Sequence, residues 1–273
     1  MTKTIKTLVK DVEAVLTEPH EFSKDAVSRF SKRLAETIVE KINPTYKGGT
    51  VRISNLGKPD RQLWYSVNHP DAAETLPFSA RMKFLFGDIL EELLMFLAEE
   101  AGHTVEGRQD VLSIGGVSGH RDGKIDGVLV DAKSASSFSY KKFKDGLKHE
   151  DDSFGYLTQL NSYHQASPDV DPSQMAFFVI DKQLGHVCLD IHKPSKDNYA
   201  KLAQYKTAMV QEAIPPRCYE DEEDGKSGNR KLGTACSYCP FKSKCWPEMR
   251  TFLYSNGPRY LTKVARLPDV PEV

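Results

Sequence analysis

The sequence predicts an α/β fold, and three observations lead to this class. Apolar residues recur at helical spacing in residues 8–42 and 79–101, which is typical of amphipathic helices. Short β-type runs bounded by turn residues occupy 117–130 and 175–190. With 273 residues, 39% of them hydrophobic and 27% charged, the chain is long enough and apolar enough to bury a substantial core.

The N-terminal part, residues 1–46, divides into two predicted helices. Apolar residues stand three or four positions apart in both, and Pro19 separates them. The apolar positions are Leu8, Val12, Val15 and Leu16 in the first run and Val27, Phe30, Leu34, Ile38 and Ile42 in the second. We expect a helical lobe that packs against the rest of the fold.

The strongest predicted helix runs from Ser79 to Ala101. It is rich in Leu, Met and Glu, and Gly102 follows it as a stop signal. Its apolar stripe extends from Phe86 to Leu97. Glu91 and Glu92 lie at the margin of this stripe, where each could point into a site or face solvent.

Residues 119–136, GHRDGKIDGVLVDAKSAS, predict a tight β-hairpin around Gly127. Val117–Ile125 forms its first strand, and the apolar second strand ends in Asp131-Ala132-Lys133. Strand alternation places Asp131 and Lys133 on one face and Ala132 on the other. Asp122 on the first strand is within cross-strand reach. Two carboxylates and an ammonium group would then meet at the edge of a sheet.

Such a trio suits the hydrolysis of phosphodiesters. Mg²⁺ takes oxygen ligands, usually one or two carboxylates together with water and phosphate. A nearby lysine can orient or deprotonate the attacking water, or hold a phosphate oxygen. An Asp-x-Lys tripeptide alone more often marks an exposed ion pair of little energetic consequence. The neighbouring motifs are therefore needed to distinguish a catalytic site from such a pair.

Gly119-His120-Arg121-Asp122, followed by Val130-Asp131-Ala132-Lys133, resembles the core of the PD-(D/E)xK nucleases in their RecB-like exonuclease branch. The acidic helix motif at 86–94 precedes the hairpin and the Gln-x-x-x-Tyr motif at 159–163 follows it, which is the family's order. The resemblance covers residues 50 to 250. Two departures stand out: the step from Asp122 to Asp131 is short, with Asp126 as a competitor, and Glu91 stands where the family often has histidine.

This resemblance implies a restriction-endonuclease-like mixed central sheet flanked by helices, and a metal-dependent DNA exonuclease. It implies Mg²⁺ or Mn²⁺ held by Glu91, Asp122, Asp131 and the carbonyl of Ala132, with Lys133 positioning the attacking water. Gln159 and Tyr163 would assist. They lie one turn apart on one helix face, where both can bond a phosphate or Lys133 and Tyr163 can also stack on a base.

Basic and aromatic residues on either side of the core are candidate DNA contacts. The net charge of −1 means that DNA binding must use local basic patches. Arg52, Arg61 and Trp64 precede the core, although Trp64 suits a core position equally well; Lys141, Lys142 and Lys144 lie in a polar run, 134–148, that we expect to be a solvated loop. The expected partner is DNA, as single strands or duplex ends, with a recombination or replication protein as a second partner.

Four of the five cysteines, Cys218, Cys236, Cys239 and Cys245, have the spacing C-x17-C-x2-C-x5-C. Clustered cysteines in an intracellular protein more often bind metal than form disulfides, and four thiolates suit either Zn²⁺ or a [4Fe–4S] cluster. Residues 236–246 resemble the iron–sulfur end of RecB-like exonucleases, which favours [4Fe–4S] with Zn²⁺ as the alternative. Cys188, in a predicted strand, is expected in the core.

Two functions from different classes follow. One is a metal-dependent DNA exonuclease in bacterial or phage recombination, repair or DNA processing, with an endonuclease as its variant. The other is a non-catalytic nucleic-acid-binding or scaffold protein stabilised by its cysteine cluster. No apolar run has the length of a membrane span and the N-terminus lacks a signal-peptide pattern, so we expect a cytoplasmic protein. The expected organisation is a helical lobe (1–50), a nuclease core (51–213) and a cysteine-cluster arm (214–273).

Overall fold

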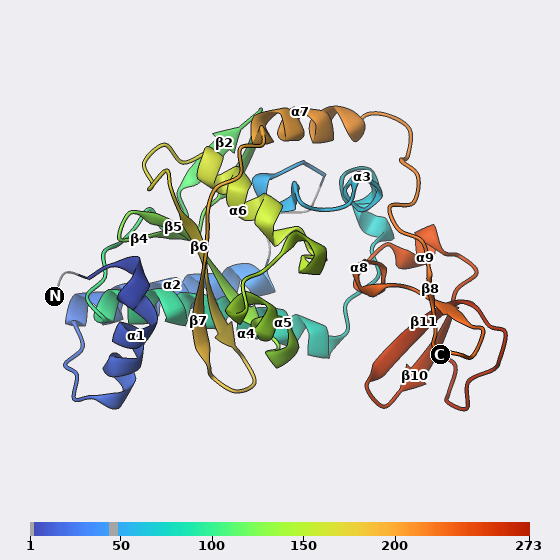
Figure 1. The fold of residues 1–273 in the computed structure, drawn as a ribbon, viewed down its shortest axis with the longest axis horizontal. Helices are drawn as coiled ribbons and strands as arrows, with labels where there is room; N and C mark the ends of the chain where they lie inside the picture. Colours follow the sequence, from blue (N-terminus) through green and yellow to red (C-terminus); the bar gives the residue numbers. More distant parts are fainter. Residues whose placement is uncertain (1–2, 44–48) are drawn as a thin grey trace. The chain divides into compact units, whose positions relative to one another are not determined.

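A computed structural model describes residues 3–43 and 49–273 (Figure 1). The outer ends of the predicted helical segment 1–46, residues 1–2 and 44–46, lie outside the described residues. The chain divides into two compact units: Met1–Lys47, Arg52–Gly57 and Leu76–Gln204 in the first, and Gly48–Val51, Lys58–Thr75 and Tyr205–Val273 in the second. This division differs from the expected three segments, because the N-terminal helices group with the sheet and residues 58–75 group with the C-terminal region.

The first unit is built on a five-stranded mixed sheet, and the predicted α/β class is confirmed. The strand order is β1-β4-β5-β6-β7, in which β5 and β6 run parallel and the other neighbours run antiparallel. A separate antiparallel ribbon pairs β2 with β3. The strands are β1 (Val105–Glu106), β2 (Val111–Ile114), β3 (Val117–His120), β4 (Gly123–Ile125), β5 (Val128–Ala135), β6 (Met175–Asp181) and β7 (Val187–His192).

Helices cover both faces of this sheet. Helices α1, α2 and α4 share one apolar core with Val128, Val130 and Ala132 of β5. On the other face, Phe143 of α5 packs edge-on against Phe177 of β6, and α6 lies beside them (Figure 1). The helices are α1 (Leu8–Thr17), α2 (Lys24–Ile42), α4 (Phe78–Glu100), α5 (Ser137–Lys144), α6 (Tyr156–Gln165) and α7 (Tyr199–Met209), which runs into the second unit.

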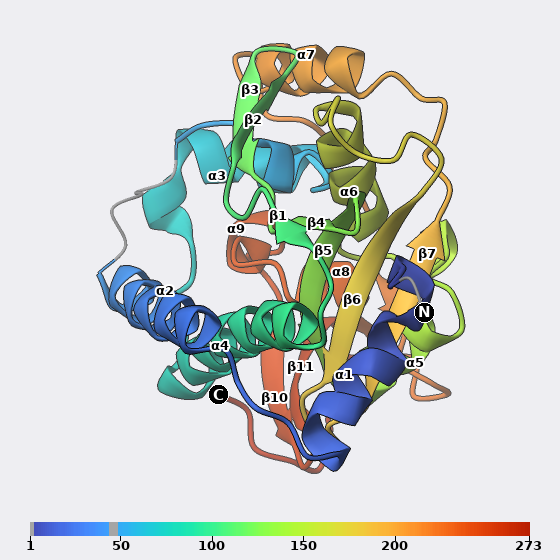
Figure 2. The ribbon, with the colours of Figure 1, turned by 90° about the vertical axis from the view of Figure 1, so that its left-hand side faces the viewer.

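Helix α4 crosses the sheet beside β5 (Figure 2), and its buried residues, apart from Gly87, lie in its second half. Leu94 to Ala98 are buried without interruption, whereas Phe86, which the sequence placed in the apolar stripe, is 55% exposed. The helix ends at Glu100, and Gly102 follows it with a φ of +81°, a conformation that glycine adopts most readily.

Two sequence predictions in the first unit are wrong. The predicted strand Val117–Ile125 is two strands, because Arg121 leaves the ladder: its N–H donates to Asp110 and its carbonyl accepts from Gln109. The polar run 134–148 contains helix α5 and is not a loop. Ser136 caps this helix by accepting from the N–H of Ser139, while Tyr140 and Phe143 are buried on one side.

The second unit contains a small antiparallel sheet that the sequence analysis did not predict. Its strand order is β10-β11-β9-β8, with strands β8 (Glu222–Glu223), β9 (Arg230–Lys231), β10 (Arg250–Tyr254) and β11 (Gly257–Lys263). Its helices are α3 (Asp60–Asn68), α8 (Thr234–Ser237) and α9 (Lys242–Cys245). Across the residues described in both units, no helix has the length and apolar character needed to cross a membrane.

Candidate active site

The candidate site lies at the end of β5, where one edge of this strand loses its neighbour. Gly123, the first residue of β4, pairs with Val130, so β4 does not extend along β5 beyond that point. Instead, Oδ2 of Asp122 accepts a hydrogen bond from the N–H of Ala132 at 2.9 Å. A side-chain carboxylate thus replaces the missing strand and is fixed next to the Asp131-Ala132-Lys133 segment.

Asp131 and Lys133 lie on the same face of β5, as strand alternation requires. Lys133 Nζ donates to Asp131 Oδ1 at 2.7 Å and to the carbonyl oxygen of Ala132 at 3.3 Å. Asp131 is only 5% exposed, and its Oδ2 is buried with no hydrogen-bond partner among the described residues. A buried carboxylate oxygen in this state is energetically costly, and a cation would relieve the cost.

The third carboxylate comes from α4, which approaches β5 closely at Gly87. A Cβ atom at this glycine would lie 2.8 Å from Ser134 Oγ. One turn later, burial raises the pKa of Glu91 to about 8, Lys133 opposes the rise, and Asp122 adds to it. Glu92 has a different partner, because its Oε2 accepts from Arg108 at 2.6 Å. The structure therefore brings Glu91, and not Glu92, to the end of β5.

Three carboxylates and one ammonium group leave an excess of negative charge. Burial, followed by the charge of Asp131, raises the pKa of Asp122 to about 7. Burial works against the charge of Lys133, but the surrounding carboxylates, Asp131 first, outweigh it and raise the pKa of Lys133 above its ordinary value. Lys133 is therefore protonated and acts as a donor. Asp122 and Glu91, in contrast, gain their full charge most readily beside a further cation.

A cavity of about 350 Å³ opens in front of these groups. Glu91, Asp122 and Ala132 line it, together with residues of α2 and α4 that the sequence analysis did not select. Among these, Asp88 pairs with Lys41 at 2.7 Å. Asp88 stands one turn before Glu91 on α4, and this spacing is the sequence signal that could have identified it.

Helix α6 approaches the same groups from the other face. Lys133 Nζ lies 5.7 Å from the centre of the Tyr156 ring, a contact that the sequence analysis missed. Tyr163 is 5% exposed and hydrogen-bonds with Ser54, so it is too buried to stack on a base. Gln159 is partly buried, and its side chain makes no hydrogen bond within the described residues.

Asp126, the competitor of Asp122 in the sequence, belongs to a different contact. It forms the turn between β4 and β5 with a φ of +51°. Its Oδ2 lies 2.7 Å from His103 Nδ1, and its Oδ1 accepts from the N–H of Thr104 at 3.1 Å. The structure brings Asp122 to Asp131 and uses Asp126 to hold the turn.

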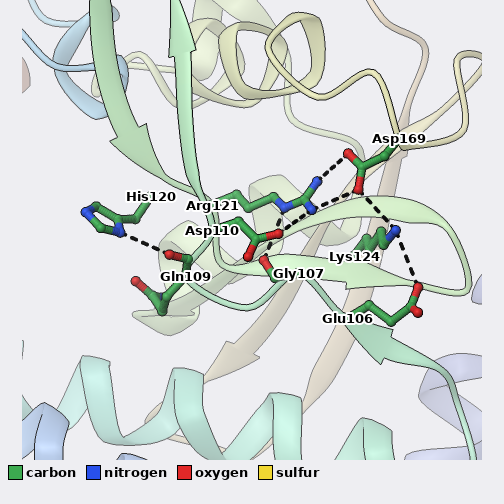
Figure 3. A network of polar contacts seen from close by, with 8 residues as sticks. All are labelled: Glu106, Gly107, Gln109, Asp110, His120, Arg121, Lys124 and Asp169. Atoms are coloured by element: carbon green, nitrogen blue, oxygen red, sulfur yellow. Dashed lines mark hydrogen bonds and ion pairs between the residues drawn. The ribbon is translucent and has the colours of Figure 1, made fainter.

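Arg121 lies next to Asp122 in the chain and is the centre of a separate polar network (Figure 3). Its buried guanidinium donates to both oxygens of Asp169, at 2.8 and 2.9 Å, and to Asp110 at 2.7 Å. Lys124 also donates to Asp169, at 3.1 Å. The hydrogen bond from Arg121 lowers the pKa of Asp169 below its ordinary range, and Lys124 adds to this effect.

The basic candidates lie on several elements. Lys141 and Lys144 are exposed on α5, whereas Lys142 donates to the carbonyl of Asp151 at 2.9 Å. The N–H of Arg52 donates to Asn55. In the second unit, the indole N–H of Trp64 donates to the carbonyl of Glu212 at 2.9 Å, and this ring packs against the small core of Leu63, Met209 and Val210.

The four predicted cysteine ligands line one small cavity in the second unit. Arg61, a predicted DNA contact, is engaged here: its backbone N–H donates to Cys218 Sγ at 3.5 Å and its Nε to Cys245 Sγ at 3.3 Å. Burial raises the pKa of Cys236 to about 11, and the charges of the neighbouring cysteines add to this rise. Cys188 is buried on β7, apart from this group.

The donor sets can be compared with what metal ions require. Within residues 3–43 and 49–273, no three His, Cys, Asp or Glu side chains form a ready-made metal-binding group. Mg²⁺ and Mn²⁺ need fewer protein ligands, because water and phosphate complete their shell; Asp122 and Asp131, with the unpartnered oxygen of the latter, fit this requirement. The four thiols line one cavity, which is the donor type that Zn²⁺ or an iron–sulfur cluster takes, but within the described residues no three of them stand close enough to form a ready-made site, so the cluster stays a prediction.

Comparisons with known proteins give no family and a weak structural likeness. No protein-family model and no curated protein matches this chain. Among solved structures, the crystal structure of SSO0001 is similar with a TM-score of 0.45 and 16% sequence identity, over 79% of this chain and 95% of that one. A likeness of this size carries no information on function.

Proposed function

We propose that this chain is a metal-dependent DNA nuclease of the PD-(D/E)xK type, in the RecB-like exonuclease branch, whose first unit has a restriction-endonuclease-like fold. The observation that supports this most is the group formed by buried Asp131 and partly buried Glu91, Asp122 and Lys133 beside a cavity. Packing gains nothing from an excess of buried negative charge, and a divalent cation would offset it.

In this proposal each residue has a defined role. Asp122, Asp131 and the Ala132 carbonyl would hold Mg²⁺ or Mn²⁺, with Glu91 completing the set. When bound, the cation would lower the pKa of a water molecule and offset the charge on the phosphate. Lys133 would donate a hydrogen bond to the attacking water or to a phosphate oxygen.

The proposal is tested by Mn²⁺-dependent digestion of end-labelled single- and double-stranded DNA. We expect Asp131→Asn to slow cleavage by about 100-fold or more, because a carboxylate ligand of the cation is lost. Asp126→Asn is the matched control and should retain the rate, because Asp126 contacts His103 and Thr104 instead. Equal rates for the wild type and Asp131→Asn would leave a non-catalytic nucleic-acid-binding protein.

A circular single-stranded substrate separates the two kinds of nuclease. An exonuclease leaves the circle intact while it degrades a linear strand of the same sequence. Cleavage of both at similar rates would change the proposal to an endonuclease.

For the second unit we propose a [4Fe–4S] cluster, with Zn²⁺ as the alternative, held by Cys218, Cys236, Cys239 and Cys245. Its contribution would be to stabilise the unit, since metal binding at a site absent from the unfolded chain adds to the free energy of folding. Visible absorption with bound iron and sulfide in anaerobically purified protein would support the cluster. Colourless protein with bound zinc would support the alternative.

A further inference from the structure

The first two turns of α4 expose two aromatic side chains, Phe78 and Phe84, of which Phe84 lies between two basic ones. Phe84 is 54% exposed, and Arg81 and Lys83 are exposed beside it. Within the part of the chain that the structure describes, neither Lys83 nor Phe84 has a hydrogen-bond, ion-pair or ring partner. Arg81 uses only its Nε, which donates to the carbonyl of Leu76 at 3.3 Å. The cationic groups and the ring are therefore available to a ligand.

This group points along the face of α4 that carries Glu91. Phe84 precedes Glu91 by seven residues, so the two share a helix face at a separation of about 10 Å along the axis. Gly87 lies between them on this face, at the point where α4 contacts Ser134 of β5. A strand of DNA whose scissile phosphate lies at the end of β5 would meet Phe84 a few nucleotides away.

The ligand that matches this chemistry is single-stranded DNA. Unpaired bases stack on exposed aromatic rings, and the flanking phosphates pair with Arg and Lys. The two aromatic residues that the sequence offered for stacking are already engaged, because Tyr163 is buried and Trp64 packs in the second unit. We propose that Phe84 stacks on a base of a single strand while Arg81 and Lys83 contact its phosphates; this rests on the proposed nuclease function for the position of the scissile phosphate.

The direct test is the Kd of a mixed-sequence single-stranded 12-mer, measured by fluorescence anisotropy in EDTA so that no cleavage occurs. Phe84→Ala should raise Kd by about 5- to 150-fold, the usual effect of removing one stacked base contact. Phe84→Trp should retain binding. Duplex DNA of equal length should bind to Phe84→Ala as to the wild type, because its bases are already stacked.

Phe86→Ala is a closely matched control. Phe86 is 55% exposed against 54% for Phe84, but it points to the opposite side of α4 from Glu91. Its truncation should leave Kd unchanged. The double variant Arg81→Gln/Lys83→Gln should reduce the slope of log K against log salt by about 1.4, the value for two phosphate contacts on a single strand.

The outcomes separate this inference from the proposed function. Unchanged Kd for Phe84→Ala, an equal effect of Phe86→Ala, or no binding of the strand by the wild type would overturn the single-strand site. If Phe84→Ala alone weakens binding but the wild type does not cleave DNA with Mn²⁺, the binding site stands and the nuclease function fails. If the wild type cleaves DNA and Phe84→Ala has normal Kd and KM, the nuclease function stands and the single-strand binding site fails.

Discussion

Arg121 and Asp122 are adjacent in the chain, yet they belong to two charged groups with opposite electrostatic properties. Around Arg121, the partners favour the ionised forms, and the pKa of Asp169 is lowered (Figure 3). Around Asp122, burial and a like charge disfavour ionisation, and its pKa is raised. The same residue types thus stabilise the charged forms around Arg121 and destabilise the charged form of Asp122.

The difference shows how a structural charge network can be told from a binding site. Arg121 has an acceptor for each of its guanidinium nitrogens, namely Gly107, Asp110 and Asp169. At the end of β5, one carboxylate oxygen of Asp131 lacks any donor among the described residues. A network whose members satisfy one another contributes to folding, whereas an unsatisfied buried charge gives a site affinity for a ligand of opposite charge.

The largest expected effect is a difference in cleavage rate between variants of the two lysines, one in each group. Lys133 and Lys124 have side chains that are both 17% exposed, and both pair with carboxylates. Lys133→Met should slow Mn²⁺-dependent cleavage by about 100-fold or more, because the donor to water or phosphate is lost. Lys124→Met should keep the rate within about twofold, as an ion pair outside the site contributes little. Initial rates at saturating DNA measure both, and equal losses would contradict the distinction.

The stability effects should have opposite signs in the two groups. Arg121→Met leaves Asp110 and Asp169 without their shared donor and should lower the free energy of unfolding by about 2 kcal/mol, because Asp169 is partly hydrated and recovers some solvation. For a chain of this size, this lowers Tm by about 4–8 °C. Asp122→Asn should leave the Tm of the metal-free protein unchanged or raise it, because it removes repulsion with Asp131. Thermal denaturation in EDTA measures both, and a fall in Tm for both variants would argue against the comparison.

The last expected effect is on the pH dependence of stability without metal, where the sign of the change tests the comparison. The folded pKa values of Asp122 and Glu91, about 7 and about 8, lie above the ordinary 3.8 and 4.5. Between these limits the folded chain binds protons that the unfolded chain has released, so stability should fall as pH rises from 4.5 to 8. Tm should therefore fall as pH rises across this range. The double variant Asp122→Asn/Glu91→Gln should flatten this slope. A wild-type slope of the opposite sign would contradict the raised pKa values.

The parts of the fold and site that the sequence predicted rest on local periodicity. Alternation in β5 is sufficient to place Asp131 and Lys133 together, and helical spacing is sufficient to predict α4 and α6. Helix α5 was missed because the number of lysines and serines hid its short amphipathic pattern, in which only Tyr140 and Phe143 turn inward. The β10–β11 hairpin had a usable signal in Asn256-Gly257, which the sequence analysis did not apply.

Other features depended on contacts that no local pattern encodes. The difference between Glu91 and Glu92 depends on Arg108, which lies in a loop 16 residues further on and pairs with Glu92. The role of Trp64 was open for the same reason, since an aromatic residue suits a core and a binding surface equally well, and Tyr163, expected at the site, is buried. Their neighbours, Glu212 and Ser54, are distant in sequence.

The parallel pairing of β5 with β6 has a consequence for synthesis on the ribosome. Asp131 and Lys133 pair in register with Phe177 and Val179, and a parallel partner is reached only through the crossover that contains α5 and α6. A nascent chain that has not yet emerged as far as β6 therefore lacks the strand that holds these two residues in place. The cluster at the end of β5 is therefore assembled only after β6, Met175–Asp181, has emerged from the ribosome.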